Sequence, residues 1–262
     1  MSNNPLRRPA TSPSDNLAGR LAMTIGRALD PTLAYALLRN GVAGKLLQTI
    51  GLKRIITLPL VTRVGLNTDF FGAGLLDKPG NMLLTMNAIT ALRHIWWANA
   101  ECSSEFPVSA GAFVSGFNSL YTVINSLVFV YRVSRGKTNP LASNWMQYLG
   151  FLAVVVGNVG EIVIESSRRA FKNDKRNAGK VYDQGAWGVV RHPNYAFYTL
   201  HRVGTALATG SILNATLTFL FQNGIFALSS IPDFSNHMAS KYKEQWAAYT
   251  KRVPYVLIPY VY

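Results

Sequence analysis

The sequence predicts an all-α integral membrane protein with about five to seven transmembrane helices, and three observations support this class. Of its 262 residues, 49% are hydrophobic and only 15% are charged, which is more apolar than is usual for a soluble domain. Residues 108–130 carry no charged side chain and are long enough to cross a bilayer. Basic residues gather in short segments between apolar runs, as they do in the loops of membrane proteins.

The net charge of +14 does not indicate a partner of the nucleic-acid class, because the basic residues are scattered rather than aligned on one face. We expect the lipid bilayer as the partner, with Lys and Arg side chains meeting anionic headgroups. The one cysteine, Cys102, excludes an intramolecular disulfide and a cysteine-based metal cluster, and no metal site is expected. Residues 1–16 are polar and are predicted to form a disordered tail.

The first half of the chain gives weaker signals for membrane spans. Residues 17–52 contain helix-forming apolar residues, but Arg27 and Asp30 interrupt them. We therefore prefer one or two amphipathic helices at the membrane surface to a span. Residues 55–66 are apolar but short, which fits an interfacial or bent helix, and residues 68–80 read as a loop.

A stronger helical run covers residues 82–98 and is interrupted by Arg93 and His94, just before two tryptophans. Tryptophans beside a basic pair are typical of the membrane interface. His94 could be catalytic, but we prefer an interfacial or structural role. Residues 99–107 are predicted to form a polar loop.

The second half of the chain gives clearer spans at residues 108–130 and 145–164. Residues 197–230 are predicted to form two spans, divided by small residues near Gly210. Both basic loops are expected to face the cytosol: the one that follows the first span, and the one at residues 166–180. In the C-terminal stretch three aromatic residues are predicted to share one face of a helix lying on the membrane: Tyr242, Trp246 and Tyr249.

Residues 180–198 form a polar segment between long apolar runs, and this segment is the best functional lead. Arg191, His192, Asn194 and Tyr195 offer many hydrogen-bonding groups in a short span, and the arginine can bind a phosphate or a carboxylate through two bonds. Upstream, Glu161 and Glu165 are four residues apart and share a helix face. Two readings of these carboxylates stay open. They are functional, or they reach headgroup water or pair with the arginines one turn further on: Arg168 and Arg169.

Three blocks, at residues 160–172, 179–198 and 249–262, resemble the C-terminal domain of the steroid 5-alpha-reductase-like family, in particular its uncharacterised small integral-membrane branch. The Arg-His-Pro-x-Tyr core of the second block also occurs in isoprenylcysteine carboxyl methyltransferases and phospholipid methyltransferases. The resemblance divides the chain into N-terminal membrane helices, 17–140, and a C-terminal membrane domain, 141–262. It implies a cofactor pocket in the second part that opens to the cytosol.

The resemblance also implies which residues hold NADPH. It places acidic or amide groups at two positions of one helix. It places basic groups, an asparagine and a tyrosine at positions further along the chain. With the polar core added, the expected cofactor-binding residues are Glu161, Glu165, Lys172, Lys180, Arg191, His192, Asn194, Tyr195 and Tyr249. The sequence departs from the reductase pattern where Phe197 and Tyr198 replace a Gly-Glu pair, and where Ser167 replaces a glutamine.

Three functions fit these residues. The first is an NADPH-dependent reductase of a C=C bond in a lipid-like steroid or enone, located in the endoplasmic reticulum, with Tyr198 or His201 polarising the substrate carbonyl. The second is a methyltransferase that uses S-adenosylmethionine on an isoprenylcysteine or lipid, although only one carboxylate lies in residues 231–236, where methyltransferases carry an acidic pair. The third is a non-catalytic membrane protein that retains the scaffold.

Overall fold

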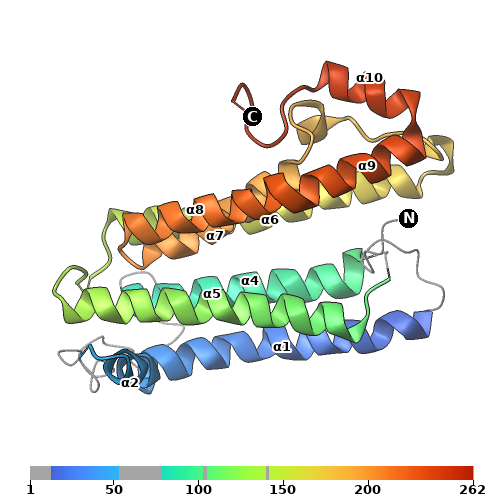
Figure 1. The fold of residues 1–262 in the computed structure, drawn as a ribbon. Helices are drawn as coiled ribbons and strands as arrows, with labels where there is room; N and C mark the ends of the chain where they lie inside the picture. Colours follow the sequence, from blue (N-terminus) through green and yellow to red (C-terminus); the bar gives the residue numbers. More distant parts are fainter. Residues whose placement is uncertain (1–12, 53–77, 103–104, 140–141, 262) are drawn as a thin grey trace. The chain divides into compact units, whose positions relative to one another are not determined.

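The computed structural model describes residues 13–52, 78–102, 105–139 and 142–261, and in these ranges every regular element is a helix. The predicted all-α class is therefore confirmed. The α-helices, coloured along the chain in Figure 1, are α1 (Pro13–Arg39), α2 (Val42–Thr49), α4 (Pro79–Trp96), α5 (Val108–Ser134), α6 (Trp145–Asn173), α7 (Pro193–Ala208), α8 (Ile212–Ile225), α9 (Ile231–Tyr242) and α10 (Glu244–Arg252).

Three helical stretches among the described residues are long and apolar enough to cross a membrane: Val108–Ser134, Trp145–Asn173 and Ile212–Tyr242. The first two contain the spans predicted at 108–130 and 145–164. The third is longer than predicted, because α8 continues through a π-helical turn at Phe226–Ser230 into α9. The total of five to seven spans stays a prediction.

The length of α6 bears on the predicted orientation of the basic loops. Its 29 residues form one helix, which is about 43 Å long at 1.5 Å per residue and exceeds the roughly 30 Å of a bilayer core. A helix that crosses once places its two ends on opposite sides. A single crossing by α6 would place the basic loops before and after it on opposite sides, and the cytosolic orientation of either loop stays a prediction.

The chain divides into two compact units. The first comprises residues 1–152 and 204–215, and the second comprises residues 153–203 and 216–262. Residues 17–52 form two helices, as the sequence allowed, and α1 packs along α5 and α4 in the first unit. The predicted loop at 99–107 starts too early, because α4 continues in a π-helical turn to Glu101. Arg93 does not end this helix; its guanidinium lies 2.9 Å from the Glu101 carboxylate, and both side chains are buried.

In the second unit, α6 and α7 approach closely at two glycines of α6. A Cβ atom on Gly157 would lie 2.8 Å from the backbone nitrogen of His201, and one on Gly160 would lie 2.4 Å from the ring of Phe197. At the C-terminal end, the chain turns between α9 and α10 at Lys243, which has φ +46°. Tyr242 and Tyr249 therefore lie on different helices, and the prediction of one shared helical face was wrong. They pack together in a buried cluster with Trp246 and Val253 instead.

Candidate functional site

The polar segment predicted to be functional lies in the second unit, between α6 and α7. It contains a 3-10 turn, Gly185–Gly188, in which Gly185 adopts φ +56°, a value that favours glycine. This turn buries Trp187, whose backbone carbonyl accepts a hydrogen bond of 2.8 Å from the hydroxyl of Tyr249. Burial is the main reason that the pKa of Tyr249 is raised above its ordinary value, so this hydroxyl keeps its proton. It secures the turn from α10.

The C-terminal segment holds the Arg-His-Pro core through backbone hydrogen bonds. The amide of Arg191 donates to the carbonyl of Tyr255, and that of His192 donates to the carbonyl of Val256, both at 2.9 Å. The Arg191 side chain also donates to the Pro254 carbonyl at 3.2 Å. Pro193 then begins α7, where a missing amide hydrogen costs nothing. The third block of the resemblance thus holds the centre of the second.

The loop between these blocks is held by α6 on one side and by α10 on the other. The Lys172 ammonium donates to the backbone carbonyl of Lys180 and, at 3.0 Å, to the hydroxyl of Tyr242. The amide side chain of Gln245 bonds the nitrogen of Val181 and the carbonyl of Gly179, each at 3.3 Å. The loop backbone is therefore fixed, whereas the Lys180 side chain is exposed.

Four buried polar atoms of this segment have no hydrogen-bond partner among the described residues: Trp187 Nε1, Arg191 Nε, His192 Nε2 and Asn194 Oδ1. Most buried polar atoms in folded proteins are hydrogen-bonded, so four within eight residues are unusual. The imidazole of His192 is 2% exposed and stacks on the Tyr195 ring at 5.1 Å. Burial, and then the nearby charge of Arg191, lower the pKa of His192 to about 4, so the ring is neutral at pH 7.

The two carboxylates of α6 differ in their surroundings. Glu161 is buried at 8% exposure. Glu165 accepts hydrogen bonds of 3.0 and 2.5 Å from Arg168, so the structure contains the arginine pair that the sequence left open. The Arg168 guanidinium lies 5.3 Å from the centre of the Trp187 ring. Glu165 is thus linked through Arg168 to the polar segment.

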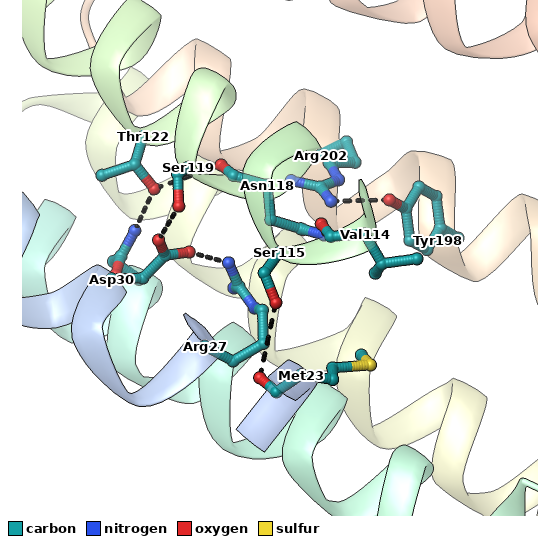
Figure 2. Close-up of polar contacts among 11 residues, drawn as sticks. Met23, Arg27, Asp30, Val114, Ser115, Asn118, Ser119, Thr122, Tyr198 and Arg202 are labelled. Carbon is teal, nitrogen blue, oxygen red and sulfur yellow. Dashed lines mark hydrogen bonds and ion pairs between the residues drawn. The ribbon is translucent and has the colours of Figure 1, made fainter. Parts of the chain in front are cut away.

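On α7, Tyr198 and its neighbours form an aromatic group with one cation. Arg202 donates a 2.6 Å hydrogen bond to the Tyr198 hydroxyl, as Figure 2 shows. The His201 ring is fully buried and meets the Tyr198 ring edge to face at 4.8 Å. Tyr195 stacks on Phe226 at 4.2 Å. His94, the other histidine considered for catalysis, is buried on α4 in the first unit.

Comparison with known proteins decides the family. Residues 96–253, more than half of the chain, match the family described as "Protein of unknown function (DUF1295)". The chain belongs to this family. DUF1295 is part of the steroid 5-alpha-reductase-like group, so the resemblance drawn from the three blocks is confirmed. The match ends at residue 253, just before the carbonyls of Tyr255 and Val256 that hold the Arg-His-Pro core.

Individual relatives of this DUF1295 chain carry two kinds of name. "Probable O-methyltransferase ustE" of Ustilaginoidea virens is 28% identical over 219 residues, which cover 82% of this chain and 76% of that protein. "Delta(14)-sterol reductase" of Arabidopsis thaliana is 29% identical over 152 residues, 53% of this chain and 34% of the relative. "Delta(14)-sterol reductase TM7SF2" of Mus musculus is 37% identical over 79 residues, 30% and 19% respectively.

The DUF1295 chain thus spans 34% and 19% of the lengths of these two sterol reductases. No solved structure matches it. The comparisons identify an integral membrane protein of a reductase or methyltransferase family. They leave the predicted site residues as proposals.

Sequence reasoning missed two contacts of this site, the Tyr198–Arg202 hydrogen bond and the Tyr195–Phe226 stack. Arg202 is four residues after Tyr198, a helical spacing that could have indicated the pair. Phe226, which stacks on Tyr195, is 31 positions away along the chain and gave no comparable signal.

Proposed function

We propose that the protein is a membrane-embedded, NADPH-dependent reductase of a C=C bond in a lipid-like steroid or enone. The observation that carries this proposal is the group of four buried polar atoms without partners in residues 187–194. Their chemistry fits a polar cofactor. Indole and guanidinium nitrogens donate hydrogen bonds, an amide oxygen accepts them, and a neutral imidazole can do either.

Charge favours a dinucleotide over S-adenosylmethionine. Residues 168–180 contain six basic residues and one acidic residue, Asp174. NADPH carries several negative charges on its phosphates, whereas S-adenosylmethionine carries one carboxylate and a positive sulfonium. A cationic rim therefore attracts the first more strongly. Lys172 and Lys180 would hold phosphates, Glu161 and Glu165 would meet ribose hydroxyls, and Arg191, His192, Asn194 and Tyr195 would hold the remaining polar groups.

When bound, NADPH supplies the hydride. We assign Tyr198 the role of polarising the substrate carbonyl, because a phenolic hydroxyl can donate a hydrogen bond to a carbonyl oxygen and Arg202 holds this one in place. His201 supports the Tyr198 ring from a fully buried position, so we assign it a positioning role. A tyrosine thus stands where the reductase pattern has a glutamate. The endoplasmic reticulum and a cytosolic C-terminal loop belong to this proposal.

Methyl transfer from S-adenosylmethionine is the second candidate function. It is favoured by one observation: the relative that is aligned over most of both chains carries the name of an O-methyltransferase. The same group of polar atoms would then hold the amino-acid part of the cofactor, with Arg191 facing its carboxylate.

Cofactor binding by the detergent-purified protein tests the proposal. We expect NADPH to raise the unfolding free energy by about 2.7 kcal/mol at a hundred times its dissociation constant, and S-adenosylmethionine to leave it unchanged. Lys180→Ala should weaken NADPH binding about tenfold, since it removes one charge-assisted contact. Lys251→Ala is the matched control, because Lys251 is also an exposed lysine, on α10.

Each other outcome contradicts the reductase or the specific contact assigned to Lys180. Stabilisation by S-adenosylmethionine alone would assign methyl transfer. Stabilisation by neither compound would favour a non-catalytic protein that retains the scaffold. An equal loss of NADPH affinity in Lys180→Ala and Lys251→Ala would show that the cations attract the cofactor only through their summed charge.

A further inference from the structure

The helix α1 packs against α5 through small residues that let the two backbones approach closely. A Cβ atom on Gly111 of α5 would lie 2.3 Å from the carbonyl oxygen of Gly19, and one on Gly26 would lie 2.5 Å from Oγ of Ser115. Small residues at such contacts are typical of helix pairs within membranes. The contacts advance in the same direction along both helices, so α1 and α5 run parallel.

Two charged residues lie in the middle of α1 and are buried in the first unit. Arg27 and Asp30 are each 1% exposed and form an ion pair. The Asp30 carboxylate also accepts a 2.5 Å hydrogen bond from the Ser119 hydroxyl of α5, as Figure 2 shows. Buried charges of this kind are found almost only in pairs. The pair therefore faces the neighbouring helix rather than water or headgroups.

The outer face of α1 is apolar. Four residues spaced four apart form one exposed stripe, with exposures between 49% and 59%: Leu17, Leu21, Ile25 and Leu29. The exposed side of α5 is apolar as well, with Phe113 at 72% and Leu120 at 54%. In contrast, Ser115, Asn118 and Thr122 of α5 are buried. Polar residues inside and apolar residues outside suit a helix bundle surrounded by hydrocarbon.

The spacing of charges along α1 matches the thickness of a bilayer. Arg20 and Arg39 are 19 residues apart, which is about 28 Å along a helix, close to the roughly 30 Å of a hydrocarbon core. Between them Arg27 and Asp30 are the only charged residues. Near the first of these limits, Arg20 donates a 2.9 Å hydrogen bond to the Cys102 carbonyl at the end of the α4 extension.

The direction of α4 completes the pattern. Its side chains meet the parallel pair at two places: Asn99 donates to Thr24 at 2.9 Å, and Asn87 donates to Thr122 at 2.7 Å. The end of the α4 extension thus lies near the start of α1, so α4 runs antiparallel to α1 and α5. The three helices alternate in direction along the chain, as successive membrane spans do.

We propose that α1 crosses the bilayer parallel to α5, with the Arg27–Asp30 pair inside the hydrocarbon core and the stripe from Leu17 to Leu29 against lipid acyl chains. The preference for surface helices at residues 17–52 is replaced by this assignment for α1. Hydropathy averages overlook the helix because they count both members of a neutralised pair as exposed charges. The inference does not depend on the proposed reaction.

Sidedness of single cysteines tests the crossing. In a Cys102→Ala background, Ser14→Cys places a thiol near the start of α1, and Thr49→Cys places one at the end of α2, ten residues beyond the end of α1. Ser109→Cys and Lys137→Cys place thiols near the two ends of α5. Sealed membrane vesicles are treated with a membrane-impermeant maleimide before and after they are opened with mild detergent. We expect Ser14→Cys and Ser109→Cys to react from one side of the membrane. Thr49→Cys and Lys137→Cys should react from the other side.

Labelling of Ser14→Cys and Thr49→Cys from the same side would overturn the proposal, because both ends of a surface helix face one compartment. Labelling from opposite sides, but with Ser14→Cys matching Lys137→Cys, would also overturn it, since α1 and α5 would then cross in opposite directions.

Discussion

The buried imidazole of His192 predicts a loss of stability in mild acid. Its pKa is about 4 in the folded protein against an ordinary value of 6.5, because burial penalises the charged ring. At about 1.36 kcal/mol per pH unit, this difference corresponds to about 3 kcal/mol. The unfolded chain binds a proton below pH 6.5 that the folded chain accepts only below about pH 4. This contribution to the unfolding free energy is therefore fully present above pH 6.5, decreases as the pH falls from 6.5 to about 4, and is lost below about pH 4.

The assay is thermal unfolding of the detergent-purified protein between pH 7.5 and pH 4. We expect His192→Gln, which cannot titrate, to make the fall in stability shallower by about 3 kcal/mol, or about 6 to 12 °C in Tm for a chain of this size. His237→Gln is the control, because His237 is exposed on α9, and its pH profile should follow that of the parent. A parent and a His192→Gln variant with the same pH profile would refute the buried neutral imidazole.

Two further predictions concern packing and one hydrogen bond, and thermal unfolding in detergent measures both. Gly19→Ala should lower the unfolding free energy by about 1 to 3 kcal/mol, because the new methyl group would overlap a backbone carbonyl. Gly116→Ala on the open side of α5 should not lower it, and equal effects would contradict the close approach of α1. Tyr249→Phe should cost about 1 to 3 kcal/mol, since it leaves the buried Trp187 carbonyl without its donor. Tyr260→Phe, at an 84% exposed position, should be neutral, and a neutral Tyr249→Phe would argue against the bond.

The membrane spans were predictable to different degrees, for a physical reason. The composition of residues 108–130 and 145–164 is enough to predict membrane spans, because nearly every side chain in them is apolar or small enough to lie in hydrocarbon. In α1 the sequence shows that Arg27 and Asp30 are present. It does not show that the two side chains form a buried ion pair or that Ser119 donates a hydrogen bond to Asp30. A periodicity argument assigns each charge to water by default. Which groups neutralise a buried charge depends on the fold.

The polar segment was also predictable in part. The density of hydrogen-bonding groups around Arg191 and His192 marked it without any structure. The groups that hold it in place did not show in the sequence, because they are the backbone carbonyls of Tyr255 and Val256, which every residue type possesses. Tyr249 was expected to contact the cofactor. In the structure its hydroxyl donates a hydrogen bond to the Trp187 carbonyl, and its contact with a cofactor stays a prediction.

These contacts also explain why three separate blocks mark the family although the reaction is not the same in all relatives. The blocks hold one another: Tyr249 bonds the turn at Trp187, and Tyr255 bonds the amide of Arg191. Such residues specify a scaffold that can present a polar cofactor, and reductases and methyltransferases can share it. The choice of reaction must then depend on residues outside this mutual support. Tyr198, with Arg202 bonded to its hydroxyl, is the clearest such position in the second unit, and it is where the chain departs from the reductase pattern.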